Sequence, residues 1–171
     1  LQVGPGLDTK SQLGPSVSIK ERDKVAALVD QAIASGATVE TGGKVPTGPG
    51  AFYPATVIHV EVGNPILDYE IFGPVAPIVA VENDDEAIRL ANASPYGLIS
   101  YVFSRDLKRA IRAAEALESG MVAINRGVFS DPAAPFGGFM QRGLGGEGGF
   151  AGLHEVLGSK DMVLEINVVL G

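Results

Sequence analysis

The chain has 171 residues, of which 46% are apolar and 19% charged, a composition that suits one globular domain and argues against disorder. Its net charge of −7, without any run of Lys or Arg, argues against nucleic acid and anionic membrane surfaces as partners. No apolar stretch approaches the roughly 20 residues of a membrane span, so a soluble, cytoplasmic protein is predicted.

The N-terminal half is predicted to contain one long helix and several strands. Residues 1–17 carry Gly and Pro without a sustained period, which predicts a connector. Ser18 and Glu21 have the spacing of a capping box, and apolar residues then recur at helical intervals as far as Gly36. Strands are predicted over residues 37–40, 56–62 and 77–81, with a Gly/Pro-rich loop over 41–50.

In the second half, predicted helices and strands alternate. Acidic residues from Asp84 favour the start of a helix that runs to about Ala93, because negative charge suits the positive end of a helix dipole. A later helix is expected to be capped by Ser104 or Asp106 and closed by Gly120. Its expected apolar stripe is Leu107, Ile111, Ala114 and Leu117. Strands are predicted over residues 99–103 (buried), 121–125 and 162–170.

This alternation predicts an α/β fold with a mainly parallel sheet and flanking helices, and ligands are expected at the carboxyl ends of its strands. The apolar segment at 162–170 either joins a sheet within the subunit or pairs with a neighbouring subunit. The two histidines, His59 in a strand pattern and His154 in a loop, have no second ligand at a metal-like spacing. Both are predicted to be structural, and no metal site is assigned.

Three motifs carry a resemblance to a known family. The first is Val3-Gly4-Pro5-Gly6-Leu7-Asp8 followed by Gly14-Pro15, and the second is Glu70-Ile71-Phe72-Gly73-Pro74-Val75. The third is Pro135-Phe136-Gly137-Gly138 followed by Gln141, Gly143, Gly145, Glu147 and Gly148. Together they resemble the C-terminal portion of the aldehyde dehydrogenase family. The resemblance is nearest to its succinate-semialdehyde type, chiefly because Ser130 lies six residues before Phe136.

The resemblance implies that residues 1–157 form part of a catalytic domain. It also implies that residues 158–171 form a C-terminal oligomerisation strand, so a homo-oligomer, either a dimer or a tetramer, is expected. The chain departs from the family pattern at four positions that usually hold Lys, Ser, Arg and Glu. These positions are Met140, Arg142, Gly146 and Gly158. The two glycines, at the Arg and Glu positions, put tight oligomer packing and efficient cofactor ordering in doubt.

Glu70 and Phe72 are the candidate cofactor-binding residues. A carboxylate on a rigid turn can accept two hydrogen bonds from vicinal hydroxyls, and charged acceptors form the stronger bonds. In the resembled family this glutamate binds the nicotinamide ribose of NAD or NADP, so Glu70 is assigned that role and Phe72 is placed beside the nicotinamide ring. The alternative is that Glu70 caps a turn and Phe72 fills the core. The sequence leaves open which dinucleotide is used.

Ser130 and Phe136 are the candidate substrate-binding residues. The resemblance places Phe136 in the wall of the aldehyde tunnel, where an apolar surface excludes water. It also places the Ser130 hydroxyl against the distal carboxylate of succinate semialdehyde. The alternative is that Ser130 belongs to an ordinary turn with Asp131 and Pro132, since all three are turn-forming residue types. Glu147 is interpreted as structural.

The family uses a cysteine thiolate to attack the aldehyde, NAD(P) to accept hydride, and a glutamate to activate water. This sequence has no cysteine at all. It is therefore interpreted as a C-terminal fragment of an NAD(P)-dependent enzyme that oxidises succinate semialdehyde or a similar ω-carboxy aldehyde, inactive alone. Two alternatives stay open: a non-catalytic interaction or oligomerisation module, and an aldehyde dehydrogenase of other specificity.

Overall fold

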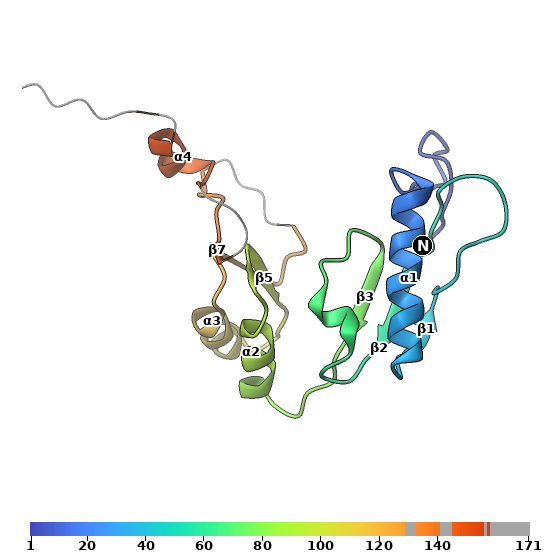
Figure 1. The fold of residues 1–171 in the computed structure, drawn as a ribbon. Helices are drawn as coiled ribbons and strands as arrows, with labels where there is room; N and C mark the ends of the chain where they lie inside the picture. Colours follow the sequence, from blue (N-terminus) through green and yellow to red (C-terminus); the bar gives the residue numbers. More distant parts are fainter. Residues whose placement is uncertain (129–132, 141–144, 156, 158–171) are drawn as a thin grey trace, which may run out of the picture. The chain divides into compact units, whose positions relative to one another are not determined.

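The computed structural model describes residues 1–128, 133–140, 145–155 and 157 (Figure 1). The chain divides into two compact units, Leu1–Glu82 and Asn83–Gly171. Each unit combines helices with strands, which confirms the predicted α/β class. The sheets are mixed rather than mainly parallel, because each unit pairs some strands in parallel and others antiparallel.

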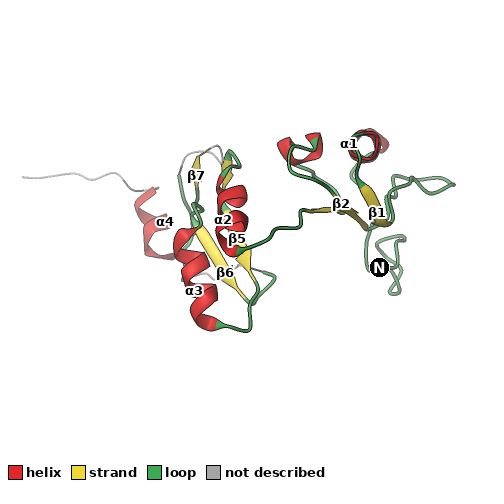
Figure 2. Ribbon diagram, turned by 90° about the horizontal axis from the view of Figure 1, so that it is seen from below, coloured by secondary structure: helices red, strands yellow, loops and turns green. Residues whose placement is uncertain are grey.

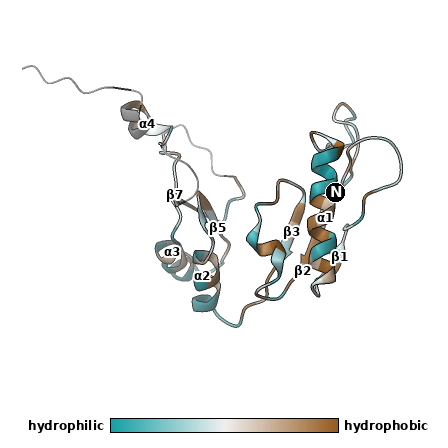
Figure 3. Cartoon of the chain, in the orientation of Figure 1, coloured by the Kyte–Doolittle hydropathy of each residue, from teal (hydrophilic) through white to brown (hydrophobic). Residues whose placement is uncertain are grey.

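Helix α1 (Ile19–Ala34) is the longest element of the first unit. The Ser18 hydroxyl accepts a hydrogen bond from the Glu21 amide at 3.2 Å, so the predicted N-cap is confirmed. Beyond the helix, Gly36 has a φ of +96°, the left-handed conformation that commonly closes helices. Hydrophilic and hydrophobic residues alternate along α1, as expected of a helix with one buried face (Figure 3).

Three short strands form the sheet of the first unit: β1 (Thr38–Thr41), β2 (Thr56–His59) and β3 (Val75–Ile78). Strand β2 lies in the middle, antiparallel to β1 and parallel to β3. Strand β3 begins two residues earlier than predicted and includes Pro77. Proline is accepted there because β3 is an outer strand of this sheet, where a missing N–H need not remove a ladder bond.

The core of the first unit lies between α1 and the sheet. Its buried residues are Val25, Val29, Ala32, Tyr53, Ile58, Val60 and Ile66. Asn64 is also buried and precedes the short 3-10 helix η1 (Pro65–Asp68). Its side-chain nitrogen donates to the Ala32 carbonyl at 3.1 Å, and its oxygen accepts from the Ile66 amide at 3.2 Å. Asn64 therefore satisfies an amide at the start of η1, and it adds a bond to a carbonyl at the end of α1 that also accepts from the Ser35 and Ala37 amides.

We expect Asn64→Ala to lower the free energy of unfolding by about 1–3 kcal/mol, because it removes the hydrogen-bond acceptor of the buried Ile66 amide. Denaturant titration of the purified protein measures this loss. Asn92→Ala is the matched control, since Asn92 is less buried than Asn64 and also makes two side-chain bonds to backbone, with Ala116 and Glu118. An equal loss in both variants would contradict a special role for burial at Asn64.

The second unit alternates helices and strands (Figure 2). Its elements are α2 (Asp84–Asn92), β4 (Tyr96–Gly97), β5 (Ile99–Val102), α3 (Leu107–Ala116), β6 (Met121–Ile124), β7 (Phe139–Met140) and α4 (Gly149–Glu155). Strands β5 and β6 pair in parallel, whereas β4 and β7 pair antiparallel. Helix α3 packs on both β5 and β6.

Two predictions about side chains in this unit were wrong, and so was one about the backbone. In the predicted apolar stripe of α3, Ala114 and Leu117 are partly buried, but Leu107 and Ile111 are 65% and 44% exposed, whereas Ala110 is fully buried. The helix thus packs on the strands through small residues, whereas the prediction had relied on large apolar side chains. Strand β5 is not fully buried, since Tyr101 is exposed. His154 lies in α4 rather than in a loop.

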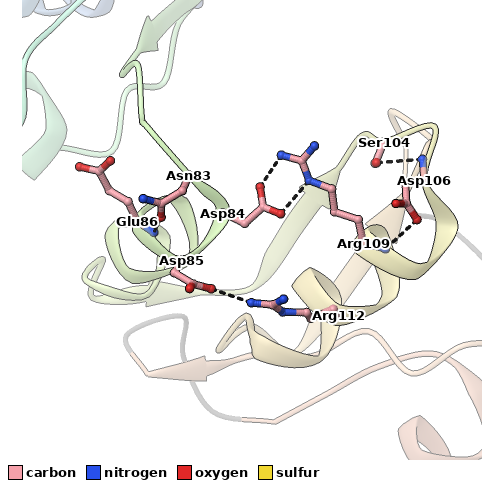
Figure 4. Close-up of polar contacts among 8 residues, drawn as sticks. All are labelled: Asn83, Asp84, Asp85, Glu86, Ser104, Asp106, Arg109 and Arg112. Atoms are coloured by element: carbon pink, nitrogen blue, oxygen red, sulfur yellow. Dashed lines mark hydrogen bonds and ion pairs between the residues drawn. The ribbon is translucent and has the colours of Figure 1, made fainter.

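Two exposed ion pairs join α2 to α3 (Figure 4). The Arg109 guanidinium donates to both carboxylate oxygens of Asp84, at 2.7 and 2.5 Å, and Arg112 donates to Asp85 at 2.9 Å. The hydrogen bonds from Arg109 hold the pKa of the Asp84 carboxyl below its usual value. Asp106 caps α3 by accepting from the Arg109 amide, so the second of the two predicted caps is confirmed.

Candidate functional site

Glu70 and Phe72 lie in the turn between η1 and β3. The Gly73 amide donates to the Ile71 carbonyl at 2.9 Å, and the Val75 amide donates to the Gly73 carbonyl at 2.8 Å, which makes the turn tight. Glu70 is exposed, and the Phe72 side chain is 75% exposed. Phe72 is therefore not a core residue of this unit, and its ring is available for contact with another molecule or another part of the protein.

A cleft of about 760 Å³ lies beside this turn. Its lining residues are Leu13, Gly14, Pro15, Ser16, Val17, Glu21, Tyr53, Ile71, Phe72, Gly73 and Pro74. Phe72 contributes to the wall, whereas Glu70 is not among the lining residues. A Cβ on Gly73 would lie 2.7 Å from a methyl group of Val25, so glycine lets the turn pack directly on α1. The turn is thus held against the helix on one side and borders the cleft on the other.

Tyr53 forms a buried part of the cleft wall. Burial raises the pKa of its hydroxyl, and the charge of Asp30 acts in the same direction. Among the described atoms, the hydroxyl has no hydrogen-bond partner of good geometry. Neighbouring Thr56 instead donates to the Pro54 carbonyl and accepts from the Gly43 amide, both at 2.9 Å. The sequence reasoning missed Tyr53, although the first motif had pointed to Gly14 and Pro15.

Phe136 lies in the second unit and is partly exposed. Its backbone forms a two-way bridge with Glu147: each amide donates to the other residue's carbonyl. Glu147 is thus paired with Phe136 through its backbone. Ser130, Arg142 and Gly158 lie outside the described residues.

Close backbone packing explains the glycines around Phe136. A Cβ on Gly120 would overlap the main chain of Gly137 and Gly138. On the other side, a Cβ on Gly148 or Gly149 would lie 2.8 Å from the carbonyl oxygen of Ala134 or Ala133, respectively. Both of these glycines have positive φ, of +74° and +57°. The segment that carries Phe136 is thus enclosed by positions that side chains cannot occupy.

The chain makes a left-handed turn at Asn125, directly after β6, where φ is +54°. The Asn125 side chain accepts from the Ser104 amide at 2.9 Å and donates to the Ser104 carbonyl at 2.8 Å. Asparagine tolerates this conformation better than most residues. These bonds hold the backbone at the carboxyl end of β6, where the chain leaves the strand.

A second cleft of about 480 Å³ lies in this unit, between α2, β5 and α3, and its lining includes none of the motif residues. Within the described residues, no group of three or more His, Cys, Asp or Glu side chains could hold a metal ion. His59 instead lies 3.4 Å from the Glu40 carboxylate. No helix in the described part of the chain is long and apolar enough to cross a membrane.

We expect Gly120→Ala to lower the free energy of unfolding by about 1–3 kcal/mol, because the added methyl group displaces the backbone at Gly137. Gly127→Ala is the matched control, since a Cβ at Gly127 would meet nothing within 4 Å. That variant should change stability by less than about 0.5 kcal/mol. Thermal or denaturant unfolding of both variants provides the comparison, and equal stability would contradict the close approach.

Comparison with known proteins identifies the class of protein. The model of the aldehyde dehydrogenase family matches residues 1–162, so the chain belongs to this family and the resemblance seen in its motifs is confirmed. The chain is 49% identical over 156 residues to a succinate-semialdehyde dehydrogenase of Paenarthrobacter nicotinovorans, covering 91% of this chain and 35% of that protein. It is 41% identical over 165 residues to succinate-semialdehyde dehydrogenase [NADP(+)] 1 of Schizosaccharomyces pombe, covering 95% and 33%.

The similarity extends to relatives with other named substrates and to solved structures. A non-phosphorylating aspartate-semialdehyde dehydrogenase of Halomonas elongata is 40% identical over 161 residues, covering 94% of this chain and 33% of that protein. The structure of Gox0499 has a TM-score of 0.91 at 38% identity, covering 96% and 36%. A betaine aldehyde dehydrogenase of Staphylococcus aureus in complex with NAD+ has a TM-score of 0.87 at 41% identity, covering 93% and 33%. The chain spans about a third of the length of these relatives.

Proposed function

We propose that this chain is part of an NAD(P)-dependent aldehyde dehydrogenase that oxidises succinate semialdehyde, or a similar ω-carboxy aldehyde, to the acid. The observation that carries the proposal is the exposed turn at Glu70 and Phe72, which borders a cleft in a chain of this family. The similarity to succinate-semialdehyde dehydrogenases over most of the chain supports the substrate class.

The cleft beside Phe72 suits a nicotinamide cofactor. Its walls are largely apolar, with Phe72, Ile71 and Val17 among them, and an apolar wall can pack against a planar ring. The exposed carboxylate of Glu70, two residues before Phe72, can accept hydrogen bonds from ribose hydroxyls. We assign Glu70 to the nicotinamide ribose and Phe72 to the position of the ring. Both NAD and NADP stay within the proposal, since relatives are named with one or the other.

We expect Glu70→Gln to raise the KM for NAD(P) by about tenfold or more, because the amide accepts a weaker hydrogen bond and carries no charge. The KM for the aldehyde should change much less. Steady-state kinetics of the whole enzyme, with each substrate varied in turn, tests this split. Asp68→Asn is the control, since Asp68 is an exposed acid two residues earlier. Equal effects of the two substitutions would contradict the role of Glu70.

The substrate side of the site is assigned to Phe136 and Ser130. The backbone packing around Phe136 supports its role as a fixed wall, because the segment has little room to move. We assign the Ser130 hydroxyl to the distal carboxylate of the aldehyde. The residues of this chain would thus position the cofactor and the substrate.

Bond chemistry is assigned to groups outside these 171 residues. No residue of the chain is a cysteine, so the thiolate that attacks the aldehyde must come from elsewhere in the whole enzyme. When bound, the nicotinamide cofactor accepts the hydride. We therefore propose that the segment alone is inactive. We also propose that the whole enzyme is a homo-oligomer and that residues 158–171, which lie outside the described residues, contribute an oligomerisation strand.

We expect the whole enzyme to have a higher kcat/KM for succinate semialdehyde than for butanal, an uncharged aldehyde of the same chain length. Ser130→Ala should reduce kcat/KM for succinate semialdehyde selectively, by about 5- to 150-fold, which corresponds to about 1–3 kcal/mol for a lost hydrogen bond to a charge. An equal reduction for butanal would make Ser130 structural.

A different semialdehyde is the second candidate substrate. The similarity to an aspartate-semialdehyde dehydrogenase favours it, because that relative covers 94% of the chain. Aspartate semialdehyde differs from succinate semialdehyde by an added amino group, so both present a carboxylate to the site. If the wild-type enzyme shows no preference for succinate semialdehyde over butanal, the assay with aspartate semialdehyde decides between this candidate and an enzyme of other specificity.

A further inference from the structure

Hydrogen bonds made by residues outside the three motifs connect the two walls of the cleft beside Phe72. One wall is residues 13–17, and part of the other is Tyr53. The Ser16 amide donates a hydrogen bond of 2.9 Å to the carbonyl of Ala51, two residues before Tyr53. The position of Tyr53 relative to the first wall therefore depends on where the chain is held at residues 50 and 51.

Arg22 holds the chain at that point. It lies in the first turns of α1, and its side chain is only 14% exposed. One guanidinium nitrogen, Nη1, donates to the carbonyl oxygen of Gly50 at 2.9 Å. The other two nitrogens, Nε and Nη2, donate to one carboxylate oxygen of Asp23, at 2.9 and 2.7 Å. Asp23 thus orients the planar group, and the bond to Gly50 is charge-assisted.

The backbone at Gly50 has a conformation that requires glycine. Its φ is +102°, and a Cβ there would lie 2.6 Å from the ring of Phe52. Another residue must hold the backbone at Gly50 in this conformation, since glycine itself restricts the backbone very little. Arg22 holds it through the bond to the Gly50 carbonyl. Arg22 belongs to the same helix as Glu21, which is another residue of the cleft wall.

We propose that Arg22 is a positioning residue for the cofactor cleft: it holds the Gly50 carbonyl and thereby sets the distance between Tyr53 and residues 13–17. Arg22 does not line the cleft, so it acts through other residues rather than by touching the cofactor. This inference rests on the proposed function, because the proposed cofactor-binding role of the cleft comes from Glu70 and Phe72.

The experiment compares three variants of the whole enzyme. Arg22→Ala removes the bond to Gly50, Arg22→Lys retains a cation that can reach the carbonyl, and Asp23→Ala removes the carboxylate but leaves the bond to Gly50 possible. Two quantities are measured: hydrogen exchange of the peptide that contains the Ser16 amide, without cofactor, and the dissociation constants for NAD+ and NADP+. The KM for the aldehyde is measured alongside.

We expect Arg22→Ala to speed exchange at Ser16 and to weaken binding of the preferred dinucleotide, each by about tenfold. The KM for the aldehyde should change by less than about twofold. Arg22→Lys should recover part of both effects, and Asp23→Ala should cause smaller changes than Arg22→Ala. If Arg22→Ala does not fold, Arg22→Lys and Asp23→Ala are each compared with wild type. Arg22→Lys should then cause the larger losses, because only the lysine variant alters the group that bonds to Gly50.

Three results would overturn the inference. They are unchanged exchange at Ser16, equal effects of Arg22→Ala and Asp23→Ala, and equal losses for cofactor and aldehyde, which would make Arg22 merely structural. Failure of the proposed function is a separate outcome: a wild-type enzyme that binds neither NAD+ nor NADP+ would refute the cofactor site. In that case, hydrogen exchange at the Ser16 amide still shows whether Arg22 stabilises the bond between the two walls.

Discussion

Hydrogen bonds from side chains to backbone hold the loops of both units to their helices and strands. In the first unit, Asn64 joins the end of α1 to η1, and Arg22 joins the start of α1 to the loop before Tyr53. In the second unit, Asn92 joins α2 to the end of α3, and Asn125 joins β6 to the residue after Phe103. The strands are only two to four residues long, so their ladders alone could not position such long connections. Glu70, Phe72 and Phe136 likewise lie on connections between elements rather than in helices or strands.

Helix starts were the part of the fold that the sequence predicted best, because the signals are local. The end of α3 was predicted wrongly, since the helix ends at Ala116, before Gly120. Ser18 and Asp106 cap their helices through bonds to residues three positions away. Strand limits were less predictable. Strand β2 ends at His59 although β-branched residues continue to Val62, since pairing partners decide where a strand ends. The buried face of α3 was missed because packing on β5 and β6 selects a small residue, Ala110.

The candidate site shows the same division between local and distant information. Glu70 and Phe72 were assigned from a contiguous hexapeptide, and the tight turn that exposes them involves only its own residues. The cleft beside them was not predictable, because Tyr53 and Val17 come from segments far apart in the sequence. Likewise, the glycines near Phe136 were visible in the third motif, but the partner of the Gly137 backbone is Gly120, which no local pattern connects to it.

Pro77 in β3 has a consequence for the behaviour of the chain when its outer strand is uncovered. The carbonyls of Pro74 and Ile78 face β2, so alternation along the strand directs Pro77 away from it, toward the open edge. A strand from another molecule that aligned with this edge would find no N–H at that position. Natural sheets often resist unwanted edge-to-edge pairing in this way. The proline therefore disfavours the pairing of another chain with this edge of the sheet.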